Sequence, residues 1–129
     1  MNREIYEKGM ALRRKVLGQA HIDRRQKSQD PITQAHQALG TEFAWGTIWA
    51  RPGLPLKVRS LVTLGILTAL GREDELRGHV AGALNNGATP EEIAEVFVHA
   101  AVYCGFPASN TALRNCVEVF RERGVLPRD

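Results

Sequence analysis

The chain has 129 residues, of which 43% are hydrophobic and 24% are charged, and its formal net charge is +3. This length suits one compact domain with a buried core, and this composition excludes a chain that is mostly disordered. The longest apolar run is broken by Gly65 and Gly71 and falls short of the roughly 18 residues that span a membrane. We therefore expect a folded protein without a membrane-spanning segment.

Basic residues gather near the N-terminus, in the stretches LRRK and HIDRRQK. No aromatic platform, zinc-finger spacing or helix-turn-helix pattern accompanies them, so a nucleic-acid partner has no specific support. The first residues, MNREIYEKGM, lack the apolar core of a signal peptide. We expect a cytoplasmic protein in which both cysteines are thiols.

The N-terminal part is expected to hold two helices separated by an arm. Apolar residues at helical spacing and a glycine stop predict a helix over residues 2–17. The polar stretch QAHIDRRQKSQD is expected to be an arm or loop, which makes residues 1–30 an N-terminal helix and arm. Asp30 and Pro31 form an N-cap and first-turn pair for a helix that reaches about the tryptophans. The stretch RPGLP, residues 51–55, predicts a turn because proline does not suit a helix interior.

The C-terminal part is expected to be a run of four helices. Residues 56–70 are apolar on most sides, which indicates burial within the domain or between subunits. A short amphipathic helix should follow Gly71 and end at NNG, residues 85–87. TPEE, residues 89–92, predicts a capping box for a helix ending near Gly105, and a last helix should span about 107–123. Without period-two alternation, we predict an all-α fold of about six helices in one domain, residues 1–129.

A charged line after Gly71 is the first candidate site. Arg72, Glu75 and His79 are spaced i, i+3 and i+7, so they share one face if the helix starts by Arg72. The line then lies at the margin of the apolar stripe, where pockets form. The alternative is a solvated helix with a Glu/His pair worth at most a few tenths of a kcal/mol, which spacing alone favours.

Two further groups have an open interpretation. Glu95, His99 and Tyr103 form a column at i,i+4 spacing, either a polar seam or part of a site. Without an HExxH motif or a dense His/Cys cluster, we expect no metal site. The cysteines, at positions 104 and 116, form no CxxC pair, so thiol redox chemistry is poorly supported.

The tryptophans have i,i+4 spacing and are followed by an arginine. Trp45 and Trp49 in EFAWGTIWARPGL precede Arg51 at the turn. These residues are either an aromatic packing face or a hydrophobic pocket wall with an arginine ready for a carboxylate.

Together these stretches resemble the carboxymuconolactone decarboxylase family over nearly the whole chain. The resemblance rests on YEKGMALRRKVLGQAHIDR, FAWGTIWARPGL and RSLVTLGILTALGREDELRGHVAGALNNGATPEEIAEVFVHAAVYCGFPASN. The downstream helices are similar to the wider alkylhydroperoxidase D-like superfamily, whereas GMALRRKVLG, HIDR and WARPGL are similar to the decarboxylase branch. The redox branch carries CxxCxxxH. Aligning its histidine on His79 puts its cysteines at Arg72 and Glu75, which argues against a thiol peroxidase.

The resemblance implies a fold, an assembly and a reaction. It implies an all-α, single-domain AhpD-like fold that assembles as a homotrimer or homohexamer with active sites near subunit contacts. It implies the decarboxylation of 4-carboxymuconolactone to the enol-lactone of β-ketoadipate in aromatic catabolism, without a cofactor because the lactone is its own electron sink. The alternatives are decarboxylation of another lactone or unsaturated acid, and a non-catalytic helical assembly protein.

Each candidate residue then has a hypothetical role. His79 is expected to donate the proton or bind the oxyanion, with Glu75 orienting it. Arg72 or Arg51 is expected to hold the retained carboxylate. Other expected substrate-binding residues are of three kinds. The tryptophans would desolvate the departing carboxylate, and His99 and Tyr103 would line the site. His21 and Arg24 of HIDR would either reach a neighbouring subunit's pocket or only fasten the oligomer.

Overall fold

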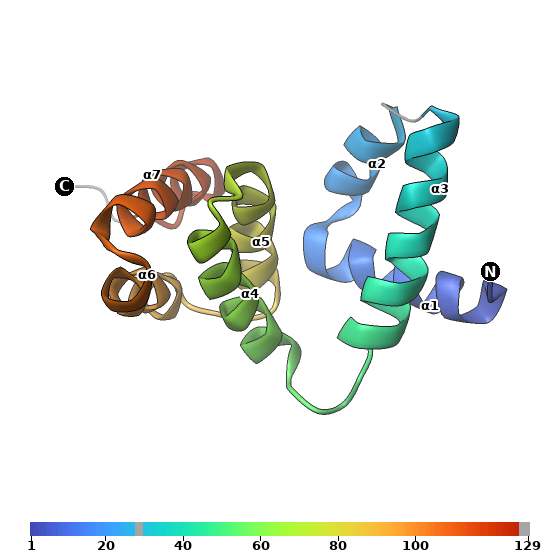
Figure 1. The fold of residues 1–129 in the computed structure, drawn as a ribbon, viewed down its shortest axis with the longest axis horizontal. Helices are drawn as coiled ribbons and strands as arrows, with labels where there is room; N and C mark the ends of the chain where they lie inside the picture. Colours follow the sequence, from blue (N-terminus) through green and yellow to red (C-terminus); the bar gives the residue numbers. More distant parts are fainter. Residues whose placement is uncertain (28–29, 127–129) are drawn as a thin grey trace. The chain divides into compact units, whose positions relative to one another are not determined.

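Every regular element in residues 1–27 and 30–126, the part that the computed structural model describes, is helical (Figure 1). There are seven α-helices in these ranges and one π-helix, so the all-α prediction is confirmed with one helix more than the six expected. The elements are α1 (Arg3–Leu17), α2 (Gln19–Lys27), α3 (Pro31–Gly40), the π-helix η1 (Thr41–Trp49), α4 (Leu56–Leu70), α5 (Glu73–Asn85), α6 (Pro90–Cys104) and α7 (Phe106–Arg123).

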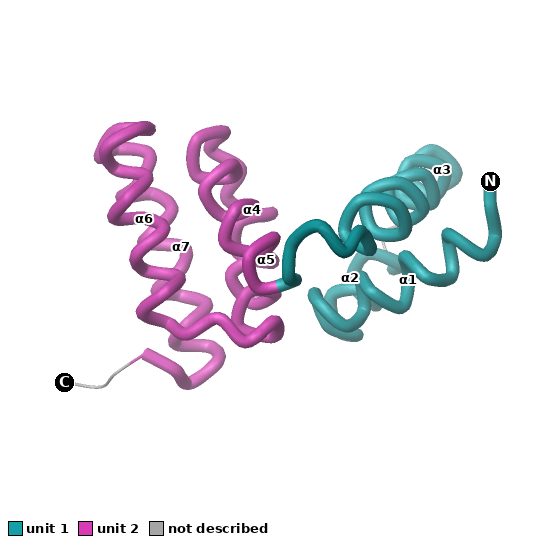
Figure 2. The backbone as a smooth tube through the Cα atoms, turned by 90° about the horizontal axis from the view of Figure 1, so that it is seen from below, with its two compact units in different colours: residues 1–56 teal, residues 57–129 magenta. Residues whose placement is uncertain are grey.

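The chain divides into two compact units, residues 1–56 and residues 57–129 (Figure 2). Unit 1 holds α1, α2, α3 and η1. Unit 2 holds α4 from Lys57 onward, together with α5, α6 and α7. Each unit is described by itself, and the single domain over residues 1–129 stays a prediction. None of the described helices is long and apolar enough to cross a membrane.

In unit 1, α1 and η1 meet backbone to backbone. A Cβ added to Gly9 would lie 2.2 Å from the carbonyl oxygen of Thr41, and one added to Gly46 would lie 2.4 Å from that of Ile5. Neither position therefore accommodates a side chain. The two glycines let the helices approach more closely than side-chain packing allows, and this contact organises the unit.

The predicted arm over residues 19–30 is wrong for most of its length. Gln19–Lys27 is the helix α2, while residues 28 and 29 lie outside the described part of the chain. The stretch has one buried apolar residue, Ile22, which is 1% exposed. A helix anchored by one apolar side chain has no stripe to detect, so tertiary packing decided its structure.

The helix expected to run from Pro31 to about the tryptophans changes type on the way. Asp30 caps α3 as predicted, because its carboxylate accepts a hydrogen bond from the Thr33 amide at 2.8 Å. From Thr41 the chain continues as a π-helix, whose hydrogen bonds run from i to i+5. The Trp45 and Trp49 rings stack in this element, with centroids 4.6 Å apart and planes at 24°.

In unit 2, apolar side chains fill the interior. The core holds Leu64 of α4, Leu76 and Val80 of α5, and Ile93 and Phe97 of α6, each no more than 1% exposed. Burial of these side chains is the main stabilising contribution to the unit. Residues 51–55 form no regular element, as predicted for RPGLP.

The predicted capping box at residues 89–92 is confirmed. The Glu92 amide donates to the Thr89 hydroxyl at 3.0 Å, and the Thr89 amide donates to the Glu92 carboxylate at 3.0 Å. The helix α6 that starts there ends at Cys104, next to Gly105 as expected. This local signal required no tertiary contact, which explains its reliability.

A polar network ties α5 to α7 outside the core. Arg77 of α5 forms ion pairs with Glu118 and Glu122 of α7, the latter at 2.9 Å. Asn115 of α7 donates a hydrogen bond at 2.8 Å to the carboxylate of Glu73, at the start of α5. The N-terminal half of α5 is therefore tied to α7 by charged and polar groups.

Candidate functional site

The charged line on α5 is shorter than the sequence suggested. Arg72 is the N-cap residue, with φ −90° and ψ 85°, so the helix begins one residue later, at Glu73. Glu75 and His79 keep their i,i+4 relation on α5. Glu75 is exposed, whereas His79 is half-buried and its Nδ1 atom is buried. The pair therefore has one group facing solvent and one at the edge of the core.

Arg72 lies at a different place from this pair. It lines a cavity of about 260 Å³ with Thr68 and Leu76 and with residues of α7, including Thr111. Glu75 and His79 are not among the residues that line this cavity. Within one chain, the three predicted residues do not converge on it.

The column on α6 lines a groove in unit 2. Glu95, His99 and Tyr103 border a groove of about 560 Å³, and Leu61 and Val62 of α4 contribute to its apolar wall. The His99 and Tyr103 rings are 5.2 Å apart at their centroids and tilted by 42°. The structure thus brings these two residues together beside apolar surface.

Glu92 lines the same groove and is held in its charged form. It pairs with Lys57 at 2.8 Å. The hydrogen bond from Lys57 and then the one from the Thr89 amide lower the pKa of this carboxyl. The wall of the groove therefore carries an ionised carboxylate whose charge is compensated by Lys57.

Trp49 and Arg51 lie together in unit 1, as the pocket-wall interpretation of their sequence expected. They line a groove of about 670 Å³, which we call the Arg51 groove. Lys8 and Lys15 of α1 also line it, together with apolar residues such as Leu54. Trp45 is 8% exposed and stacks on Trp49, so it supports the wall from behind.

Sequence reasoning did not select Lys8 and Lys15. Their spacing of i,i+7 on α1 puts them on one face of the helix, and that was the available signal. The Arg51 groove combines three cationic side chains with apolar walls, which suits a small acid with an apolar body.

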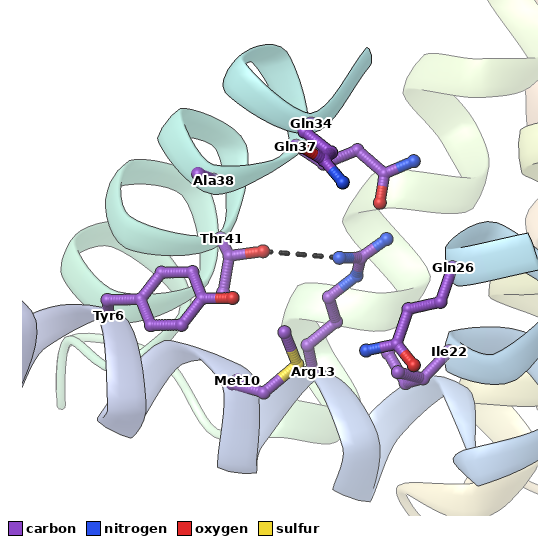
Figure 3. A pocket seen from close by; sticks show the side chains of 9 residues that line it. All are labelled: Tyr6, Met10, Arg13, Ile22, Gln26, Gln34, Gln37, Ala38 and Thr41. Atoms are coloured by element: carbon purple, nitrogen blue, oxygen red, sulfur yellow. Dashed lines mark hydrogen bonds between the residues drawn. The ribbon is translucent and has the colours of Figure 1, made fainter. Parts of the chain in front are cut away.

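His21 and Arg24 both lie on α2, near a buried arginine of α1. His21 is half-buried, and burial followed by the charges of Arg13, Arg24 and Arg25 lowers its pKa. Arg24 is exposed. Arg13 is 8% exposed and borders a second cavity of unit 1, of about 250 Å³ (Figure 3).

Sequence reasoning missed Arg13. The signal was its place on the buried face of α1, where it lies between Gly9 and Val16 at i+4 and i+7. An arginine on such a face is uncommon, because a charged side chain is rarely buried unless it is paired with another group.

Comparison with known proteins identifies the family. Residues 34–116 match the sequence profile of the carboxymuconolactone decarboxylase family. The chain is 45% identical to 4-carboxymuconolactone decarboxylase of Acinetobacter baylyi over 122 residues, which are 95% of this chain and 91% of that protein. The chain belongs to the carboxymuconolactone decarboxylase family. A second relative of this family member is nitrosuccinic acid decarboxylase of Metarhizium robertsii, 43% identical over 88% of this chain and 79% of that protein.

The two cysteines of this carboxymuconolactone decarboxylase family member do not form a redox pair. Cys116 is fully buried, and burial raises the pKa of its thiol to about 12. It is a thiol rather than a reactive thiolate at neutral pH. Cys104 is half-buried and borders the α6 groove. Among the described residues, no group of three or more His, Cys, Asp or Glu side chains could hold a metal ion.

Proposed function

We propose that this protein decarboxylates 4-carboxymuconolactone to the enol-lactone of β-ketoadipate, without a cofactor. The observation that carries the proposal is the 45% identity to 4-carboxymuconolactone decarboxylase of A. baylyi over 95% of the chain. Because the alignment covers almost the full length of both proteins, it supports a shared reaction as well as a shared fold. The β-ketoadipate pathway and a cytoplasmic location stay predictions.

The reaction needs an electron sink, which the lactone of the substrate supplies, and a proton, which a general acid of the protein supplies. When the C–C bond to the leaving carboxylate breaks, CO2 departs and the electron pair moves into the lactone system as a dienolate. Donors near the lactone oxygen stabilise this anion, and a general acid then delivers a proton to carbon. The protein therefore has to supply binding, oxyanion stabilisation and one proton.

We assign the proton transfer to His79 and Glu75. Imidazole exchanges protons near neutral pH, and the half-buried position of His79 provides partial exclusion of water. Glu75, one helical turn before it on α5, is placed to orient the ring or to pass a proton from solvent. Substitution of each residue in turn tests both roles directly.

We assign binding of the retained carboxylate to Arg51, in the Arg51 groove of unit 1, or to Arg72 of unit 2. Arg51 offers the planar fork that matches a carboxylate, and Lys8 and Lys15 add charge beside it. Trp49, supported by Trp45, provides an apolar wall that favours the loss of charge as CO2 forms.

The remaining assignments are supporting ones. His99 and Tyr103 line the α6 groove, which is large enough for a small acid. Arg72 borders a smaller cavity. Arg24 adds positive charge near the Arg13 cavity, and this charge, together with burial, favours the neutral form of His21.

Decarboxylation of a different acid is the second candidate. The 43% identity to nitrosuccinic acid decarboxylase favours it. A nitro group, like an unsaturated lactone, accepts the electron pair that a departing carboxylate leaves behind. The two acids therefore demand similar help from a protein, and family membership does not choose between them.

We also propose a homo-oligomer, a homotrimer or homohexamer. Val62, Ile66 and Leu70 recur every fourth residue on α4 and are 50%, 53% and 64% exposed in the single chain. On α6, Val98 and Val102 are 62% and 77% exposed. Apolar rows of this length favour burial against another copy. Sedimentation of the wild type and Ile66→Glu tests this, with a smaller species expected for the variant.

The decisive experiment for the reaction measures CO2 release from 4-carboxymuconolactone and from nitrosuccinate. Wild type is expected to act on the lactone, and His79→Ala to lose about a hundredfold or more in rate. Glu75→Gln should lose less. His36→Ala is the matched control, because His36 is exposed on α3, and it should keep the wild-type rate.

Each alternative has its own outcome. Release from nitrosuccinate alone would replace the lactone by the second candidate. Release from neither acid would refute both candidates, and a panel of other lactones and unsaturated acids would then separate a different substrate from a non-catalytic assembly. A wild-type rate in both His79→Ala and Glu75→Gln, each with intact helicity, would refute the site assignment while leaving the reaction in place.

A further inference from the structure

The Arg13 cavity is built around a buried guanidinium. Arg13 on α1 is 8% exposed, and its Nη1 donates a hydrogen bond to the Thr41 hydroxyl at 3.1 Å. In Figure 3 the guanidinium points into the space between the helices, toward amide side chains on its far walls. A guanidinium carries further N–H donors beyond this one bond.

Burial and positive charge dominate the surroundings of Arg13. The pKa of Arg13 is lowered, chiefly by burial and then by the charge of Arg25, while Tyr6 acts in the opposite direction and by less. Burial and then Arg13, Arg24 and Arg25 lower the pKa of His21 in the same way. Thr41, the hydrogen-bond partner, is uncharged. A buried cation in such a place is costly to the fold, and an anion entering the cavity offsets that cost.

The walls add neutral hydrogen-bonding groups. Gln26 of α2 and Gln34 and Gln37 of α3 line the cavity, as does Tyr6 of α1. Amides donate and accept, so they recognise polar atoms without cancelling the charge of the ligand. The volume of about 250 Å³ is below that of pockets for drug-sized molecules, so the ligand is small.

We infer that the Arg13 cavity binds the carboxylate group of a small organic acid, with Arg13 as its anchor and the glutamines around the rest of the ligand. A planar carboxylate matches the guanidinium fork better than a spherical ion does. This site shares no lining residue with the Arg51 groove. The inference goes beyond the proposed function, because it holds whichever acid the protein decarboxylates.

Calorimetric titration with succinate tests the inference. The full-length wild type is expected to bind succinate, and the neutral isostere succinamide should not bind. Arg13→Gln should bind succinate about tenfold or more weakly, because the charged hydrogen bonds are lost. Arg14→Gln is the matched control. It removes the same charge from the next residue of α1, which is exposed, and should bind as wild type does.

A second variant keeps the test decisive if Arg13→Gln fails to fold. Gln34→Glu places a carboxylate on the wall of the cavity, and a negative charge near the start of α3 suits the helix dipole. The new carboxylate should pair with Arg13 and exclude succinate, again by about tenfold or more. Ala35→Glu, at an exposed neighbouring position of α3, adds the same charge and should leave binding unchanged.

Three results would overturn the inference. The first is a wild type that does not bind succinate at millimolar concentration. The second is binding that survives unchanged in Gln34→Glu. The third is inorganic phosphate binding as tightly as succinate, because the cavity would then be a general anion site rather than a carboxylate site.

Discussion

Each of the two units coloured in Figure 2 is stabilised internally by a different kind of contact. Unit 2 buries a continuous apolar core that includes Phe97, and its charged contacts lie outside that core. Unit 1 depends on a backbone contact at Gly9 and Gly46, and it encloses the charged Arg13. One unit has an apolar core with its cavity at the edge, whereas the other buries a charged side chain against its cavity.

This difference suggests a division of roles, in which the core of unit 2 contributes mainly to stability and the cavity of unit 1 is available for binding. The apolar core of unit 2 is closely packed, so its cavity at Arg72 and its groove along α6 lie at the edge of that core, as do His79 and His99. In unit 1 a close backbone contact supplies the rigidity, and the interior is free for polar recognition. Four changes, each with a matched control where the chain offers one, would break or sharpen this comparison.

The largest effect is expected from Phe97→Ala in the core of unit 2. Phe97 is 1% exposed, so its loss removes apolar burial and leaves a cavity, at a cost of about 3–5 kcal/mol. Phe43→Ala removes the same side chain at a site that is 64% exposed and should change stability by less than about 0.5 kcal/mol. Urea unfolding followed by circular dichroism measures both. Similar losses in the two variants would contradict the view of unit 2.

Gly9→Ala should have the next largest effect, because it wedges α1 from η1. The added Cβ would lie 2.2 Å from a backbone oxygen, and overpacking of this kind costs about 1–3 kcal/mol. Gly40→Ala is the control. Nothing lies within 4 Å of its added Cβ, so it should be neutral or stabilising by up to about 1 kcal/mol. Tryptophan fluorescence reports unit 1 selectively, since both tryptophans of the chain lie there.

Arg77→Gln tests whether the charged network of unit 2 is secondary to its core. The variant loses the ion pairs with Glu118 and Glu122, but these groups are 30–64% exposed and screened by water. We expect a loss of about 1 kcal/mol. Arg114→Gln, on exposed surface of α7, is the control. A loss as large as that of Phe97→Ala would mean that charges, not apolar burial, hold α5 to α7.

The smallest effect is expected from pH acting on His21. Its pKa is lowered in the folded protein, so the stability from its neutral form is complete above about pH 6.5 and is lost as pH falls through the folded pKa. His21→Gln should therefore remove part of the stability loss of unit 1 between pH about 7.5 and about 5.5. Urea midpoints from tryptophan fluorescence measure it. Equal losses in wild type and variant would show that His21 does not sense the charge around Arg13.

The sequence predicted unit 2 better than unit 1, and the reason is physical. The capping box at Thr89 and the helix over residues 56–70 follow from local pattern, and both were correct. The helix α2 and the π-helical form of η1 were missed, because burial of Ile22 and the contact of η1 with α1 at Gly9 and Gly46 are tertiary. No local rule reports such contacts.

The candidate site divides in the same way. The sequence put Trp49 and Arg51 together because they are two residues apart, and it put His99 and Tyr103 in one column because helical spacing determines those neighbours. It did not select Arg13, since whether an arginine enters a cavity depends on which helices close over it.

The π-helix also sets the angular phase of the residues on its C-terminal side. Its wider turns accommodate an extra residue for each turn that an α-helix would complete over Thr41–Trp49. Wound as an α-helix, with about 100° per residue, the same residues would end at a different angle around the axis. The direction of Trp49 in the wall of the Arg51 groove therefore depends on the π-helical turns. The length of this short segment is thus as much a part of the Arg51 groove as the residues that line it.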